Sequence, residues 1–93
     1  MTTIKIETIG GFCPVQAEGT IDGKEFYFRA RGDSWRIGIG GDPVGNPEWG
    51  YSEPWGDNAY AAGWMDLEIA KDMIEKAAKL YMERDNAIDS ASA

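Results

Sequence analysis

The sequence predicts an α+β fold in which a four-stranded antiparallel β-meander is covered on one face by a single C-terminal α-helix, with a long Trp-rich loop between sheet and helix. Apolar and polar residues alternate over residues 15–39, and two tight turns interrupt this alternation, which is typical of neighbouring strands. After residue 66, apolar residues recur at spacings of three and four, which predicts an amphipathic helix. The chain has 93 residues, which is enough for one domain with one core.

Two tight turns fix the register of the three central strands. Asp22-Gly23 suits a type I′ turn, whose two residues both need positive φ, and Gly32-Asp33 suits a type II′ turn with glycine first. Two-residue loops determine which residues face each other, and both registers gather apolar residues on one face of the strands. These residues are Val15, Ala17, Gly19, Phe26, Phe28, Ala30, Trp35, Ile37 and Ile39.

The opposite face of these strands is polar, and the expected register places Arg29 directly across from Arg36. Like charges that face each other weaken a strand pair unless an anion lies over them. This face is therefore either a solvated surface with acidic residues nearby, or an arginine patch that receives a carboxylate from this chain or from a partner. The polar residues are Gln16, Glu18, Thr20, Glu25, Tyr27, Arg29, Arg31, Ser34 and Arg36.

A first strand precedes this central segment. Residues from Thr2 to Thr8 alternate between apolar and polar, and the sequence GGFCP over residues 10–14 then predicts a turn. The turn contains Cys13, the only cysteine, so no intramolecular disulfide can form. No histidine or expected helix start lies near Cys13 to activate its thiol, and we expect a half-buried structural residue.

Residues 42–64 read DPVGNPEWGYSEPWGDNAYAAGW and break both the helix and the strand pattern. Their prolines remove backbone donors and their glycines supply turns, so we expect a long loop. Its aromatic rings either fold back over one end of the core or stay exposed and anchor a partner. The second alternative predicts a partner-binding surface formed by Asp42, Glu48, Trp49, Tyr51, Glu53, Trp55 and Asp57, together with Arg29 and Arg36 of the sheet.

The C-terminal helix is expected to begin after an N-cap at Asp66 and to run from Leu67 to about Arg84. Its apolar stripe comprises Ile69, Ala70, Met73, Ala77, Leu80 and Tyr81, with Ile74 at the margin. The core is expected to contain Phe26, Phe28, Trp35, Ile37, Met73, Ala77 and Leu80. The expected surface ion pairs are Glu68–Lys71, Asp72–Lys76, Glu75–Lys79 and Lys79–Glu83. Residues 1–86 are expected to form the single domain, and residues 87–93 a frayed tail.

Charge and composition limit the classes of partner and of chemistry. The formal net charge is -7, which disfavours direct nucleic-acid binding and favours partners with a basic surface. The chain has no histidine, and therefore lacks the usual general base and the commonest metal ligand. We find no catalytic, metal or nucleotide motif, so we expect a non-enzymatic protein without cofactors. The sequence has no apolar run long enough for a membrane span and no secretion signal, and we expect a cytoplasmic protein.

The segment GGFCPVQAEGTIDGKEFYFRARGDSWRIGIGG, residues 10–41, resembles small proteins encoded by bacteriophages and mobile elements of proteobacteria, a group that includes anti-CRISPR inhibitors. The resemblance implies a compact acidic protein that blocks a host CRISPR effector by binding a basic surface where target DNA or a nuclease would dock. It transfers no catalytic or binding residue to this chain.

A small accessory subunit of a phage particle or of a bacterial assembly is the alternative, because such a protein also needs a compact domain without chemistry. The sequence leaves open whether an exposed sheet edge pairs two copies of the chain.

Overall fold

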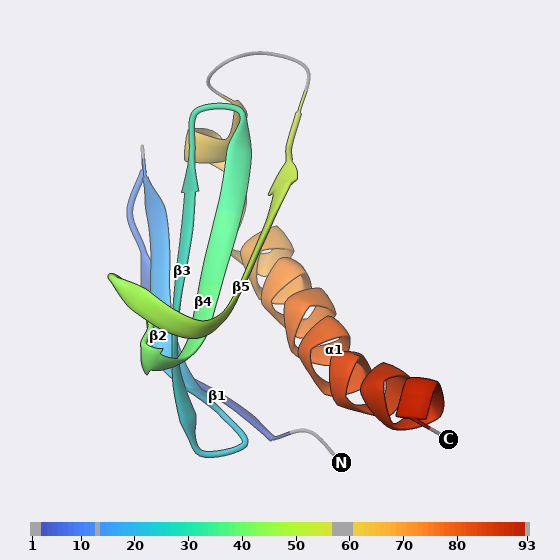
Figure 1. Cartoon of the computed structure of the whole chain (residues 1–93). Helices are drawn as coiled ribbons and strands as arrows, with labels where there is room; N and C mark the ends of the chain where they lie inside the picture. The colour runs from blue at the N-terminus through green and yellow to red at the C-terminus, as the bar shows by residue number, and fades with distance from the viewer. Residues whose placement is uncertain (1–2, 13, 57–60, 93) are drawn as a thin grey trace.

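Five strands follow one another along the chain and pair in that same order, which forms an antiparallel meander (Figure 1). The structure is a computed structural model that describes residues 3–12, 14–56 and 61–92, with residues 84–92 as backbone alone. The strands are β1 (Ile4–Gly10), β2 (Val15–Ile21), β3 (Lys24–Arg31), β4 (Ser34–Asp42) and β5 (Asn46–Pro54). A 3-10 helix, η1 (Ala61–Trp64), and one α-helix, α1 (Leu67–Ser92), follow the sheet. The predicted α+β class with an antiparallel sheet and one C-terminal helix is confirmed.

The central register is the one that the two turns predict. Asp22 and Gly23 have φ of 49° and 84°, as a type I′ turn requires, and Gly32 has φ of 65° at the first turn position of the next hairpin. Phe28 pairs with Ala17 on β2 and with Ile37 on β4. Small side chains of β2 therefore lie beside the large rings of β3, on the face that α1 covers.

The predicted loop over residues 42–64 is wrong over Asn46–Pro54, which forms the edge strand β5, so the sheet has five strands and not the four predicted. Its two prolines, Pro47 and Pro54, lack backbone donors, and an edge strand needs donors on one side only. Exposure alternates along the strand. Trp49 and Tyr51 are half-buried, whereas Gly50 between them is exposed. Residues 57–60 lie outside the described part of the chain.

The core lies between α1 and one face of the sheet. Of the seven core residues predicted, Phe26, Phe28, Trp35, Ile37 and Ala77 are buried, whereas Met73 and Leu80 are only half-buried. The predicted helix stripe is therefore rotated by about one position. Its buried members are Ala70, Ile74, Ala77, Ala78 and Tyr81, while Ile69 is 37% exposed. Spacings of three and four are compatible with two neighbouring stripes on the helix surface. The stripe that is buried contains the small alanines, which allow the helix to pack closely on the sheet.

The helix begins as predicted, because the Asp66 carboxylate accepts a hydrogen bond from the Glu68 N–H at 2.8 Å. Glu68 and Lys71 form their predicted ion pair at 3.3 Å. The other three expected pairs do not form among the described side chains, and Lys76 contacts Glu53 of β5 instead. The backbone stays helical to Ser92, so the expected end near Arg84 is wrong. The domain boundary at residue 86 and the fraying beyond it stay predictions.

The first strand lies two residues further along the chain than predicted, at Ile4–Gly10, and its pairing with β2 shifts between Ile6 and Thr8. Beside this irregularity β1 lies very close to β2 at Gly19, where an added Cβ would lie 1.8 Å from the Lys5 carbonyl oxygen. Glycine is therefore required at this point by space. Cys13, which we expect to be a structural thiol, lies outside the described residues.

Candidate functional site

One face of the sheet, called the open face here, carries no helix, because α1 and η1 both lie on the other side, and only the β4–β5 turn crosses it (Figure 1). The alternation of β2, β3 and β4 that buries the core residues turns charged and polar side chains onto this open face. Glu18, Glu25, Arg31 and Arg36 are exposed there, and Tyr27 is half-buried between the two charged ends. The open face is therefore one candidate binding surface.

One end of the open face is an arginine hollow, a depression of about 300 Å³ lined by Arg29, Arg31, Ser34 and Arg36, with Trp35 of the core beneath it. Arg29 lies directly opposite Arg36 on the neighbouring strand, as the sequence predicts. No carboxylate of the described residues lies within ion-pair distance of these arginines. The Arg29 Nε is buried and has no hydrogen-bond partner among the described residues. A buried guanidinium nitrogen without an acceptor, in a hollow lined by two further arginines, is a suitable place for an anion.

The other end of the open face is an acidic hollow, a depression of about 290 Å³ whose lining includes four acidic residues, Glu7, Glu18, Glu25 and Asp42. No cation of the described residues lies within ion-pair distance of these four carboxylates. The lining also includes Pro43 and Val44 of the β4–β5 turn. The hollow therefore presents negative charge beside an exposed apolar side chain.

The β4–β5 turn reaches the open face because β4 bends at two glycines. Gly40 and Gly41 have φ of 77° and 61°, which other residues rarely adopt. The bend carries the turn across the face that points away from α1 (Figure 1). Gly38 accommodates it, because an added Cβ there would lie 2.2 Å from the Pro43 carbonyl oxygen.

The aromatic rings predicted to bind a partner pack mainly within the chain. Trp35 contacts Tyr51 with ring centroids 5.7 Å apart, Tyr51 stacks on Trp49 at 5.8 Å, and Trp49 meets Tyr81 of α1 edge to face at 5.5 Å. Trp55 is half-buried against the same core. These contacts favour the first alternative for Trp49, Tyr51 and Trp55, whose rings fold back on the core, whereas Trp64 at the end of the same segment is exposed.

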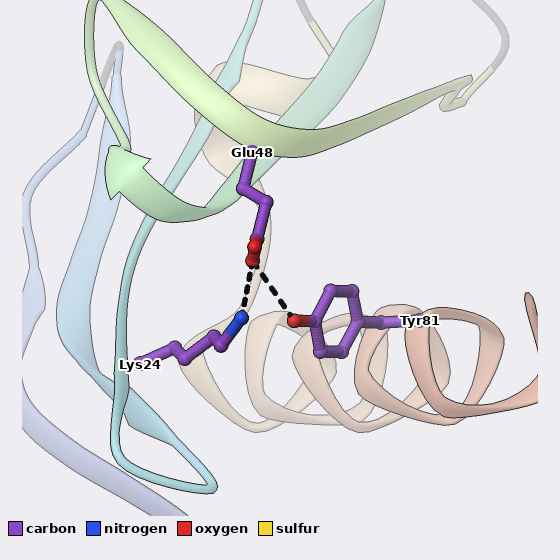
Figure 2. Close-up of polar contacts among 3 residues, drawn as sticks. All are labelled: Lys24, Glu48 and Tyr81. Carbon is purple, nitrogen blue, oxygen red and sulfur yellow. Dashed lines mark hydrogen bonds and ion pairs between the residues drawn. The ribbon is translucent and has the colours of Figure 1, made fainter. Parts of the chain in front are cut away.

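The two central carboxylates of β5 also have partners within the chain. Figure 2 shows that Glu48 reaches between the β2–β3 turn and α1, where its Oε2 lies 2.6 Å from the Lys24 Nζ and accepts a hydrogen bond from the Tyr81 hydroxyl at 3.2 Å. The hydrogen bond from Lys24 to Glu48 raises the pKa of that lysine. Glu53 pairs with Lys76 at 2.6 Å. Neither carboxylate is an isolated charge that awaits a partner.

The structure thus brings together only part of the predicted site. Arg29 and Arg36 share the arginine hollow, and Asp42 lies at the opposite end of the same face. Glu48, Trp49, Tyr51, Glu53 and Trp55 make contacts toward the helix or the core, and Asp57 lies outside the described residues.

Sequence reasoning missed the acidic hollow and one exposed aromatic pair. Alternation along β2 and β3 predicts Glu18 and Glu25 on the open face, but Glu7 and Asp42 join them only through the shift in β1 and the bend in β4. The aromatic pair is Phe12 and Trp64, which are 72% and 65% exposed with ring centroids 5.6 Å apart. They lie 52 positions apart in sequence, and no local pattern joins them.

Within the described residues there is no cluster of three or more potential metal ligands. The described part of the chain also contains no helix that is both long enough and apolar enough to cross a membrane. The chain matches no known family model, no curated protein and no solved structure.

Proposed function

We propose that this chain is a non-enzymatic protein-binding module that inhibits a host CRISPR effector in the bacterial cytoplasm, as the resemblance of residues 10–41 implies. The observation that carries the protein-binding part is the exposed pair of Phe12 and Trp64. Two large rings in mutual contact at the surface keep apolar area in water, and such rings dominate the binding energy of protein interfaces. We therefore place the anchor of the interface at this pair.

The net charge of -7 supports a partner with a basic surface. Charge complementarity mainly raises the association rate and is screened over about 8 to 10 Å at physiological salt. Affinity for such a partner should therefore fall as salt rises. A protein that only has to cover a docking surface needs no catalytic group, which agrees with the inhibitory role.

The test combines binding with a phage assay. The tagged chain is used to retain proteins from a lysate of cells with an active CRISPR system, and phage plaques are counted on the same immune host with and without the chain. We expect retention of a CRISPR effector subunit and restored plaquing. The paired variant Phe12→Ala/Trp64→Ala should lose both effects while its circular dichroism and melting temperature stay close to those of the wild type.

Val44→Ala is the matched control, because Val44 is also an exposed apolar residue but lies on the β4–β5 turn. It should retain both effects. Failure to restore plaquing on every immune host tested would refute the inhibitor. Retention of capsid or tail proteins from infected cells would instead support the accessory subunit.

A further inference from the structure

We propose that the open face of the sheet is a homodimer interface, in which two copies pair about a two-fold axis and the arginine hollow of each copy receives the acidic hollow of the other. This interface is separate from the Phe12–Trp64 anchor and does not depend on the CRISPR proposal. It differs from edge-to-edge strand pairing, because it uses side chains of the sheet face and not backbone groups of an outer strand.

The arginine hollow needs an anion that the described part of the chain does not supply. Arg29 on β3 lies directly opposite Arg36 on β4. The repulsion between their positive charges weakens the pairing of the two strands when no anion lies over them. The buried Arg29 Nε has no acceptor among the described residues, although buried donors nearly always have one. A carboxylate seated in the hollow would satisfy that donor and separate the two positive charges.

The acidic hollow, in turn, needs cations that the described part of the chain does not supply. Glu18 and Glu25 lie on neighbouring strands, and Glu7 and Asp42 approach them from either side. The Asp42 carboxylate accepts a hydrogen bond from the Val44 N–H at 3.3 Å. No described lysine or arginine lies within ion-pair distance of any of the four. A guanidinium would reduce their mutual repulsion.

The positions of the two hollows make the face self-complementary. Strand β3 carries both charges, with Glu25 near its first residue and Arg31 as its last residue, and Tyr27 lies between them. In a face-to-face dimer the two-fold axis lies in the interface, parallel to the face and perpendicular to β3, so the arginine end of each copy lies over the acidic end of the other. In a two-fold dimer each contact between an arginine and a carboxylate therefore forms twice, as an isologous interface requires.

A second copy fits these requirements better than a nucleic acid. A phosphate backbone would offer anions to the arginine hollow, but its other phosphates would meet the acidic hollow on the same face and a chain with net charge -7. A second copy supplies carboxylates for one hollow and guanidinium groups for the other at the same time.

The test uses charge reversal at exposed positions, so that folding is retained. One variant is Arg31→Glu/Arg36→Glu, whose open face carries acid at both ends, and the other is Glu18→Lys/Glu25→Lys, whose face carries cations at both ends. By sedimentation velocity we expect the wild type to dimerise, and each variant alone to dimerise at least about tenfold more weakly. Mixing the two variants should restore a dimer, because each end then meets its opposite charge.

Lys71→Glu/Lys79→Glu, on α1, changes the net charge by the same amount as the arginine variant. It is the matched control and should dimerise like the wild type. Circular dichroism establishes that every variant is folded, and wild-type dimerisation should weaken as salt rises. A wild type that stays monomeric up to about 1 mM would overturn the proposal. So would variants that dimerise normally, or a mixture that stays monomeric. Plaquing results do not enter this test, so the two proposals can fail independently.

Discussion

Glu53 of the edge strand β5 and Lys76 of α1 form an ion pair on the helix side of the sheet, with Oε2 and Nζ 2.6 Å apart. The Tyr51 hydroxyl donates a hydrogen bond to the same carboxylate. The hydrogen bonds from Lys76 and Tyr51 lower the pKa of Glu53, while the bond to Glu53 raises the pKa of Lys76 and that of Tyr51. The outermost strand is thereby tied to the helix by a group whose charge depends on pH.

The first prediction concerns acid stability. Because the pKa of Glu53 in the folded state lies below its ordinary value of 4.5, its contribution is present above that value and is lost as pH falls through the lowered pKa. Glu53→Gln should therefore lose less stability than the wild type between neutral pH and about pH 3. Urea unfolding across this range measures the difference. Glu75→Gln on α1 is the control, and equal acid sensitivity of Glu53→Gln and the wild type would contradict the prediction.

The second prediction separates a packing role from a surface role for two tryptophans. Trp49 contacts both Tyr51 and Tyr81, whereas Trp64 is 65% exposed. We expect Trp49→Ala to lower the free energy of unfolding by about 2–4 kcal/mol and Trp64→Ala by less than about 1 kcal/mol. Denaturant unfolding of both variants provides the measurement. If both variants lost equally little stability, Trp49 would not be a packing residue and its role as a partner-binding residue would again be favoured.

The central hairpins could be predicted residue by residue because local chemistry determines them. The Asp22-Gly23 turn requires two residues with positive φ, and a two-residue loop leaves one register that keeps the aromatic rings on the core face. The same register correctly placed Arg29 opposite Arg36, which is the half of the candidate site that sequence could locate.

Strand β5 and the acidic hollow could not be recognised in the same way. Pro47 and Pro54 break the strand pattern unless the strand is known to lie at an edge, and position in a sheet is not a local property. The alternation of Pro47, Trp49, Tyr51 and Glu53 was nevertheless a strand signal. Asp42 reaches the hollow through a bend at glycines, whose φ values the sequence permits but does not specify.

The third prediction tests which face of the sheet carries the stability. Phe28 is fully buried, and its ring centroid lies 5.6 Å from that of Trp35. Phe28→Ala should cost about 3–5 kcal/mol in the free energy of unfolding, because it removes a core ring and leaves a cavity. Its neighbour Tyr27 is half-buried on the open face, and Tyr27→Ala should lower the free energy of unfolding clearly less. If urea unfolding showed a larger loss of stability for Tyr27→Ala than for Phe28→Ala, the core would lie on the Tyr27 face of the sheet, which would contradict the prediction.

The last prediction concerns two glycines that differ in the space around them. At Gly19 an added Cβ would lie 1.8 Å from the Lys5 carbonyl oxygen, a backbone atom that cannot move without displacing β1. At Gly10 an added Cβ meets no atom within 4 Å, and the backbone φ is not in the left-handed region. Gly19→Ala should therefore destabilise the protein by at least about 2 kcal/mol, a size typical of overpacking. Gly10→Ala should be neutral or stabilising by up to about 1 kcal/mol, since alanine restricts the unfolded chain.

Hydrogen exchange should show faster opening of β1 amides in Gly19→Ala alone, and equal stability of the two variants would mean that β1 does not lie against β2 at Gly19.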